Sequence, residues 1–369
     1  MKMAKSINKK NIAKSKILNN MMIHGSTSKV ELAKNLNLSM PTVLSNVNEL
    51  MELGIIMEDG EYESTGGRKA RSIAINKAYR YAVGVNITAN HVGMVMINLA
   101  GDIVRQERKR FPFSTDIQYY SDLKEMLQQF MEAGAEADRI LGVGFSLPGI
   151  INGTERTLIK SHALQLENYS LKMIEQTTEY PVYFENDANA AMLAENPKSI
   201  ENAVYLSLNN TLGGAICVDG RLCTGQNQKA GEFGHIILVP NGRACYCGKK
   251  GCADAYCAAS ALTENGTYTL EEFMARLGKD KKADAVWQEY LEMLAVLISN
   301  LRMAYDTDII LGGDVGGILP AYHMKLGEMI FQYNLFDGDL SYLKYCTYTK
   351  EASAVGVAKH FFAEMINKI

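Results

Sequence analysis

Three cysteines and one histidine lie within eighteen positions of one another. His235 is followed by Cys245, Cys247 and Cys252, with glycines where the backbone must turn. Zn²⁺ in a structural site takes four nitrogen or sulfur ligands, and a set closed by protein side chains alone leaves no coordination position for a reacting water. The pattern therefore predicts a structural zinc loop. The alternative is a group of buried free thiols beside an ordinary histidine.

Carboxylates lie at both ends of this predicted metal loop. Glu232 precedes His235, and Asp254 follows the last cysteine. A loop folded around zinc would hold these two carboxylates near one another, which suits a ligand with several hydroxyl groups. A third carboxylate, Asp187, follows Asn186 at the end of a predicted strand. Solvated surface carboxylates are the alternative, but the position beside Asn186 and the metal loop favours contact with a ligand.

Charge is distributed unevenly along the 369 residues. The first 80 contain 13 Lys and Arg against 7 Asp and Glu, a balance of +6. The remainder contains 25 basic and 34 acidic residues, a balance of −9. A basic first part joined to an acidic body is typical of a nucleic-acid-binding module fused to a small-molecule module.

The composition indicates a cytoplasmic protein. No apolar run reaches the length of a membrane span, and the polar, basic N-terminus is not followed by an apolar segment. The remaining cysteines are scattered, which fits a reducing compartment better than a disulfide framework. They are Cys217, Cys223, Cys257 and Cys346.

The start of the chain has the pattern of a helix-turn-helix. Apolar residues at near-helical spacing predict one helix over residues 8–24. Ser28 can cap a second helix through Leu36, and Ser39 can cap a third to about Leu53. In the third helix the apolar positions expected to face the core are Val43, Val47 and Leu50.

The outward face of the third helix is the predicted reader of DNA. Thr42, Ser45 and Asn46 are expected there, and small polar side chains can reach base edges in the major groove. A hairpin follows, and Gly67, Arg68 and Lys69 at its tip could enter the minor groove or grip phosphate. A protein-interaction module is the alternative, but the spacing, charge and hairpin together favour DNA.

The rest of the chain alternates strands and helices. Strands are predicted at 81–87, 92–99, 103–108 and 140–147, with a helix at 116–133 between the last two. Residues 203–223 repeat the pattern of strand, glycine turn and strand, which predicts two related lobes with a cleft between them. Later helices are expected at 287–303 and 352–366, with a strand into a glycine turn at 308–313.

The motifs G-E-x-G-H and C-x-C-G-x-x-G-C resemble the signature of the ROK family of repressors, open reading frames and sugar kinases. With its N-terminal segment, the chain is most similar to the repressor branch typified by the xylose and N-acetylglucosamine repressors. The resemblance implies an α/β fold: a winged helix-turn-helix domain, then a two-lobed actin-like (ribonuclease H-like) body, as in sugar kinases, hsp70 and actin, with a structural zinc loop. The implied domains are 1–78 for DNA binding, 79–190 for the first lobe, completed by 352–369, and 191–351 for the second lobe with the zinc loop and a dimerisation surface.

The resemblance also implies roles for individual residues. Asn186, Asp187, Glu232 and His235 match the sugar-binding positions, and Asp187 is the base in the kinases. Asp254 stands where the family usually has a glutamate, so its shorter side chain reaches less far. Gln165, in place of the usual asparagine, is a weak sugar-site candidate. The other histidines, His24, His91, His162, His323 and His360, are predicted to be structural or exposed.

The kinase chemistry is only partly present. Where the kinases carry D-x-G-G-T, this chain has Asn86 to Asn90, without the magnesium-side carboxylate and the glycines that approach phosphate. The turn of the second lobe is Asn209 to Thr211, with only Gly213 and Gly214 retained. Gly312 and Gly313 resemble the adenosine turn. ATP and Mg²⁺ are therefore not expected as cofactors.

These observations favour a sugar-responsive repressor. The expected partners are operator DNA, a sugar or sugar phosphate, and a second copy of the chain in a homodimer or a dimer of dimers, without a membrane. A sugar kinase with an accessory DNA-binding head is one alternative, with Asp187 as its catalytic base. An interaction protein controlled by a transporter component is the other.

Overall fold

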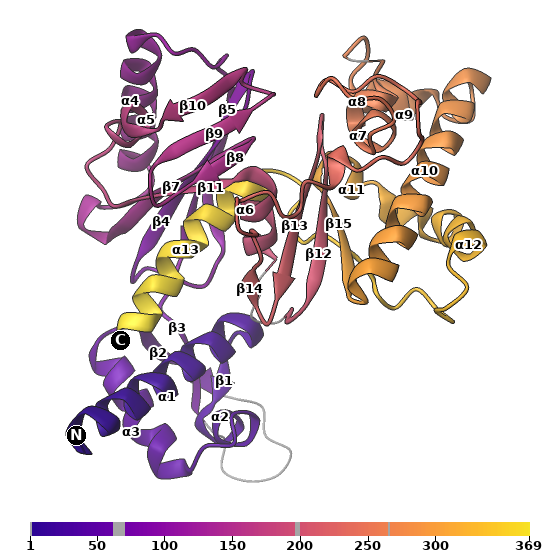
Figure 1. Ribbon diagram of the computed structural model, residues 1–369. Helices are drawn as coiled ribbons and strands as arrows, with labels where there is room; N and C mark the ends of the chain where they lie inside the picture. The colour runs from indigo at the N-terminus through magenta and orange to yellow at the C-terminus, as the bar shows by residue number, and fades with distance from the viewer. Residues whose placement is uncertain (1, 62–70, 196–199, 265) are drawn as a thin grey trace.

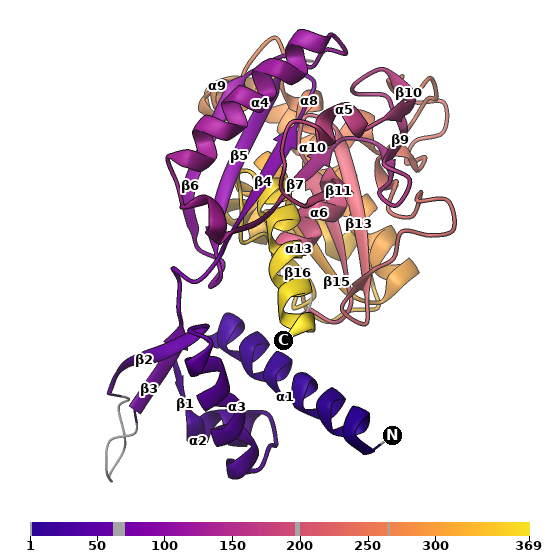
Figure 2. The same cartoon turned by 90° about the vertical axis from the view of Figure 1, so that its left-hand side faces the viewer.

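The computed structural model describes residues 2–61, 71–195, 200–264 and 266–369. Figure 1 shows a small N-terminal head below two lobes that stand side by side. One long helix, α13 (Ala352–Lys368), runs from between the lobes down to the head. The view in Figure 2 shows the head beneath the body with α1 close to the C-terminal end of α13.

The head contains three helices and a small antiparallel sheet. Ser28 caps α2 reciprocally: its side chain accepts the N–H of Glu31, and the Glu31 carboxylate accepts the N–H of Ser28. Ser39 caps α3 by accepting the N–H of Thr42. Both predicted caps are confirmed. The elements are α1 (Lys2–His24), β1 (Thr27–Ser28), α2 (Lys29–Asn35), α3 (Met40–Glu52), β2 (Ile56–Glu61) and β3 (Arg71–Ile75).

The first lobe is built on a five-stranded sheet of order β11-β7-β4-β5-β6. Strands β4, β5 and β6 form an antiparallel meander, and β7 and β11 run parallel to β4. Parallel neighbours need a crossover, which α4 provides before β7. The elements are β4 (Tyr81–Ile87), β5 (His91–Asn98), β6 (Ile103–Arg110), α4 (Ile117–Glu132), η1 (Ala137–Arg139), β7 (Ile140–Leu147), β8 (Ile150–Asn152), β9 (Thr157–Ser161), β10 (Leu166–Ser170), α5 (Lys172–Glu175), β11 (Val182–Asn186) and α6 (Asp187–Ala194).

The second lobe repeats this sheet with the order β14-β13-β12-β15-β16 and the same strand directions. In each lobe the first strand is central, the next two form a meander on one side, and the last two run parallel on the other. The predicted pair of related lobes is confirmed. The elements are β12 (Ala203–Leu208), β13 (Leu212–Val218), β14 (Arg221–Leu222), η2 (Phe233–His235), α7 (Asp254–Cys257), α8 (Ala259–Leu262), α9 (Leu270–Arg276), α10 (Lys281–Tyr305), β15 (Asp308–Gly312), α11 (Gly313–Gly316), η3 (Leu319–Tyr322), α12 (His323–Tyr333) and β16 (Leu343–Tyr345).

Helix α13 packs between α6 and the sheet of the first lobe with almost no space. A Cβ atom on Gly356 would lie 1.6 Å from the carbonyl oxygen of Ala190 in α6. Lys359 also donates to the carbonyl of Ala194 at the last turn of α6. The two helices are therefore fixed to one another both by backbone contact and by a hydrogen bond.

The head shares an apolar core with the first lobe. Ile17 and Met21 of α1 belong to the same buried cluster as Phe362 and Ile366 of α13. Burial of such side chains contributes about 1.5–3 kcal/mol each. The head is thus packed against α13 as well as being joined to the lobe by the chain after β3.

A buried cation strengthens this junction. Lys14 of α1 is 5% exposed, and its Nζ lies 2.5 Å from Oε1 of Glu49 in α3. The same Nζ donates to the carbonyl oxygen of Ile369 at 3.3 Å. A buried ammonium needs such partners, because removing one leaves an uncompensated charge. Helix α3 is consequently linked through Lys14 to the end of α13.

Among the described residues, no helix is both long and apolar enough to span a bilayer.

The contact between α6 and α13 can be tested with Gly356→Ala. Alanine normally favours a helix over glycine by up to ~1 kcal/mol, but here its Cβ meets the Ala190 carbonyl oxygen, so we expect a net destabilisation of about 3 kcal/mol. Denaturant unfolding measures this change. Gly338→Ala is the matched control, because a Cβ there meets nothing within 4 Å. Equal stability of both variants would contradict the close packing.

Candidate functional site

A cavity of about 270 Å³ lies between the two lobes. Asn186 and Asp187 line it from the first lobe, and Glu232 and His235 line it from the second. Its volume is near the lower end of the ~300–1,000 Å³ range of small-molecule pockets. The fold therefore brings together four of the five predicted sugar-site residues, which come from two lobes, in a space of the size of a small ligand.

The first-lobe side of the cavity is organised by Asn186. Its Oδ1 caps α6 by accepting the N–H groups of Ala188 at 2.9 Å and Asn189 at 3.0 Å, and its Nδ2 donates to the carbonyl of Gly149 at 2.9 Å. Its side chain also makes a hydrogen bond to Asp187 that opposes the rise in the pKa of that carboxyl group. Asn186 thus mainly positions Asp187, the first residue of α6, at the cavity wall.

Asp187 is held in an environment that disfavours its charge. Burial, followed by the negative charge of Glu232, raises the pKa of Asp187 to about 6, although hydrogen bonding to the N–H of Ala188 opposes the shift. Burial also raises the pKa of Glu232, and the nearby Lys229 opposes that shift. Two carboxylates that face one another across a small cavity provide several acceptors for ligand hydroxyl groups.

The turn that carries Glu232 lies directly on strand β13, and glycines make this possible. A Cβ on Gly231 would lie 2.6 Å from the carbonyl oxygen of Gly214, and a Cβ on Gly234 would lie 2.2 Å from that of Leu212. Gly231 also has a φ of 89°, which favours glycine. Gly214, which matches a glycine of the phosphate turn in the kinases, is therefore explained here by packing alone.

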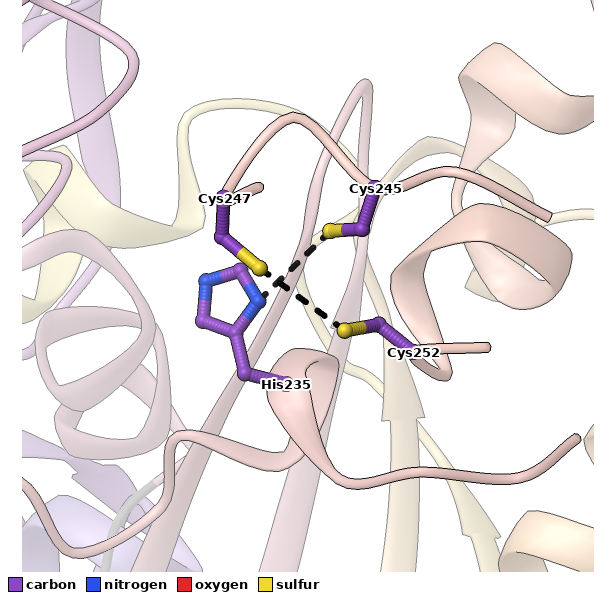
Figure 3. Close-up of side chains that lie close together, drawn as sticks. All are labelled: His235, Cys245, Cys247 and Cys252. Atoms are coloured by element: carbon purple, nitrogen blue, oxygen red, sulfur yellow. Dashed lines mark hydrogen bonds between the residues drawn. The ribbon is translucent and has the colours of Figure 1, made fainter. Parts of the chain in front are cut away.

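The four predicted metal ligands converge (Figure 3). One ligand atom from each of His235, Cys245, Cys247 and Cys252 can be chosen so that all four lie within 4.8 Å of one another. Sγ of Cys247 lies 3.7 Å from Sγ of Cys252, and Sγ of Cys245 lies 3.8 Å from Nδ1 of His235. A tetrahedral zinc with bonds of ~2.0–2.3 Å places its ligand atoms at about these separations. The cluster fits a tetrahedral metal ion.

Two predicted sugar contacts are corrected by the structure. Asp254 does not line the cavity: it is 4% exposed, and its Oδ1 accepts the N–H of Leu212 at 2.7 Å. The physical reason is its length, since an aspartate at this position reaches only the backbone of β13. Burial raises its pKa to about 6. Gln165 is exposed in a turn with a φ of 54° and also lies outside the cavity lining.

Two cavity residues were missed by the sequence prediction. His162, expected to be structural or exposed, is exposed but lines the cavity from the first lobe. Tyr246, between Cys245 and Cys247, lines it from the second lobe. For Tyr246 the available signal was its position between two predicted metal ligands. For His162 nothing nearby in the sequence points to a ligand.

The residues at the former nucleotide positions hydrogen-bond within their own lobes. Ser146 donates to Oδ1 of Asn86 at 3.2 Å. Oδ1 of Asn209 accepts the N–H of Asp314 at 2.9 Å, and its Nδ2 donates to Ser207 at 3.0 Å. Both asparagine oxygens therefore already have partners, and neither supplies a carboxylate for magnesium.

The predicted DNA-contacting residues are only partly on the surface. Ser45 is exposed on α3 and Thr42 is half-buried, with its hydroxyl 2.8 Å from that of Ser39. Asn46 was predicted to point outward and does not: it is 3% exposed, and its Nδ2 donates to the carbonyl of Thr42 at 2.7 Å. The predicted hairpin contacts Gly67, Arg68 and Lys69 lie outside the described residues.

The raised pKa of Asp187 predicts a pH dependence of stability. The folded protein holds this proton more tightly than the unfolded chain, so the contribution of Asp187 to stability is fully present below the unfolded pKa of about 4 and is lost as pH rises towards 6. We expect Asp187→Asn to reduce the loss of melting temperature between pH 4 and 7 by roughly a quarter to a third, since Asp254 and Glu232 contribute in the same direction. Differential scanning calorimetry measures this loss, and Asp122→Asn, a change at an exposed position of α4, is the control. An unchanged slope would contradict the buried setting of Asp187.

Comparison with known proteins assigns a family to each of the two parts of the chain. The ROK family profile matches residues 82–361, and a winged helix-turn-helix DNA-binding profile matches residues 10–57. The xylose repressor of Bacillus subtilis is 27% identical over 266 residues, which cover 71% of this chain and 68% of that protein.

Solved structures share the architecture. A ROK family transcriptional regulator, a homolog of the E. coli MLC protein, superposes with a TM-score of 0.74 at 20% identity and covers 98% of both chains. A ROK hexokinase from Thermus thermophilus has a TM-score of 0.62 at 25% identity and covers 78% of this chain and 99% of its own. The predicted fold class, with a winged helix-turn-helix head before an actin-like body, is confirmed. The chain therefore belongs to the ROK family and is one of its transcriptional regulators, with a DNA-binding head in front of the family's two-lobed body.

Proposed function

We propose that this chain is a cytoplasmic transcriptional repressor that binds a sugar or sugar phosphate between its lobes and does not use ATP. The observation that carries this proposal is an asymmetry in the cleft. Asp187 and Glu232 face an open cavity, whereas Asn86 and Asn209 are occupied by hydrogen bonds within their lobes. The proposed sugar contacts are Asn186, Asp187, Glu232 and His235, which all line the cavity.

The metal in the proposal is a structural zinc ion. Three cysteines and one histidine at these separations suit Zn²⁺ better than a hard cation such as Mg²⁺, which prefers oxygen ligands. With Nδ1 of His235 towards the cysteines, its Nε2 remains on the side of the cavity. The same histidine can thus hold the metal and meet the sugar.

The head supplies operator recognition. We assign residues 1–78 to DNA binding, with Thr42 and Ser45 on α3 and with Gly67, Arg68 and Lys69 in the hairpin as the expected contacts. Two heads in a homodimer would occupy the half-sites of a palindromic operator. The basic balance of this part of the chain favours contact with phosphate.

A continuous path of packed elements leads from the cavity to the head. Helix α6 starts at Asp187, packs without spare space on α13 at Gly356, and α13 ends beside α1. Lys14 joins that end to α3. A ligand that favours a closed arrangement of the lobes would bias the position of α3, because a ligand shifts an equilibrium through its differential affinity for the two states.

A sugar kinase is the second candidate, favoured by one observation. A pKa of about 6 for Asp187 suits a general base near neutral pH. The asparagines at the nucleotide positions argue against it, because magnesium and phosphate would lack their carboxylate and their close backbone approach. A coupled kinase assay with hexoses, amino sugars and pentoses decides between them: turnover that Asp187→Ala abolishes would replace our proposal.

The proposed function predicts that a sugar stabilises the protein and releases DNA. At a concentration of ~100 times Kd, a ligand that binds only the folded state adds ~2.7 kcal/mol of stability. We expect at least one member of a monosaccharide and sugar-phosphate panel to raise the melting temperature. The same compound should dissociate the protein from fragments selected from genomic DNA, measured by fluorescence anisotropy. Stabilisation without DNA release would refute the regulatory role.

The metal prediction uses Cys247→Ser. We expect it to reduce bound zinc from one ion per chain to none and to lower the melting temperature, because the loop that carries His235 loses its closure. Inductively coupled plasma mass spectrometry measures the zinc. Cys223→Ser is the control, since Cys223 is exposed and lies outside the cluster. One zinc per chain in the Cys247 variant would show that the ligand set is wrong.

A further inference from the structure

An aromatic side chain is mounted in the metal loop and reaches the cavity. Tyr246 lies between Cys245 and Cys247, is half-exposed and lines the cavity. Its hydroxyl lies 3.4 Å from Nε2 of His235, and the two ring centroids are 5.3 Å apart. Because its neighbours on both sides are metal ligands, the position of Tyr246 is set by the cluster.

A second ring meets it from the opposite lobe. The His162 ring centroid lies 5.8 Å from that of Tyr246 and 6.0 Å from that of His235, both in edge-on geometry. Such offset or edge contacts are the favourable arrangement of aromatic rings. His162 comes from the turn after β9, whereas the other two rings belong to the second lobe. The three rings therefore form a contact between the two lobes at the cavity.

The turn that carries His162 is itself held in place. Ser161 accepts the N–H of Leu164 at 3.1 Å, which closes the turn. A Cβ on Gly149 would lie 2.5 Å from the carbonyl oxygen of Lys160, so this backbone lies directly on that of the Gly149 turn. Gly149 is also the acceptor for Asn186. His162 thus has a fixed position relative to Asn186 and Asp187.

The rings supply a contact that the polar groups of the cavity do not. Asp187 and Glu232 can accept hydrogen bonds from hydroxyl groups, but they recognise a hydroxyl equally on a ring and on an open chain. A closed sugar ring also has a face of C–H groups, and burying that face against an aromatic ring is favourable because it removes apolar surface from water. An open-chain polyol presents no such flat face.

We propose that Tyr246 and His162 form an aromatic wall against which the C–H face of a ring-closed sugar packs, and that this wall selects cyclic sugars over the matching open-chain alditols. The inference rests on the proposed sugar effector and adds the class of sugar that the site takes. It also gives the metal loop a role in recognition, because the loop presents Tyr246. Since the wall has one residue from each lobe, it is complete only when the lobes are close.

The test measures binding by isothermal titration calorimetry with D-xylose, D-glucose, N-acetyl-D-glucosamine, xylitol and sorbitol. The wild-type protein should bind D-xylose at least tenfold more tightly than xylitol, or D-glucose at least tenfold more tightly than sorbitol. Tyr246→Ala and His162→Ala should weaken binding of that sugar about tenfold and about threefold, respectively, and reduce the preference over the alditol. Tyr246→Phe, which keeps the ring, should stay within about threefold of wild type. Tyr333→Ala, an exposed tyrosine on α12, is the matched control.

The outcomes separate this inference from the proposed function. Cyclic sugar binding that both alanine variants leave unchanged would overturn the aromatic wall while the sugar-responsive role stands. A wild-type protein that binds none of the five compounds, or binds alditol and ring alike, would overturn the wall as well. If the wild-type protein binds none of the five compounds, the sugar-phosphate panel and the DNA-release measurement still test the proposed function separately. Zinc content is measured on each variant. If Tyr246→Ala loses the metal, the result for His162→Ala is used to test the wall, because His162 lies outside the metal loop.

Discussion

The close packing of α6 on α13 is the constraint on which both the cavity and the head depend. The carbonyl oxygen of Ala190 leaves no space for a side chain at Gly356. Interiors packed at this density do not deform continuously, so two helices in backbone contact move together. One end of the pair forms the cavity wall at Asp187, and the other end is part of the core that holds α1. The same contact thus defines one wall of the cavity and the orientation of the DNA-binding part.

The two sets of residues in the cleft differ in how well they match the kinase pattern: the sugar-contact positions match it, and the nucleotide positions do not. On the retained side, glycines place the turn of Glu232 directly on β13, so a carboxylate and a histidine face the opposite lobe. On the changed side, Asn86 and Asn209 satisfy their oxygens with groups of their own lobes. A neutral amide gives no negative charge to a metal–phosphate complex, and part of the acceptor capacity of each of these amides is already used. The function of this cleft is therefore better explained by binding than by phosphoryl transfer.

Some parts of the site could be predicted because they depend on neighbours in the chain. Ser28 and Ser39 cap helices through contacts three residues away, and the four candidate metal ligands lie within one short segment. Other parts could not. Asn46 was placed outward by helical periodicity, yet it is buried because the head packs around that face of α3. Asp254 was placed in the cavity by its resemblance to a glutamate, yet its shorter side chain ends at the backbone of β13.

The sequence by itself determined the main strands and helices of the head and the two lobes, the division into a basic head and an acidic body, and a set of four candidate metal ligands. Each of these follows from local spacing, charge or periodicity, which act over a few residues. Only the tertiary structure decided which side chains meet across the cleft. His162 and Tyr246 are 84 positions apart, and they meet because the turn after β9 and the loop that carries Tyr246 line the same cavity from different lobes. Long-range contacts of this kind depend on the relative placement of whole lobes, and no short pattern in the chain encodes that placement.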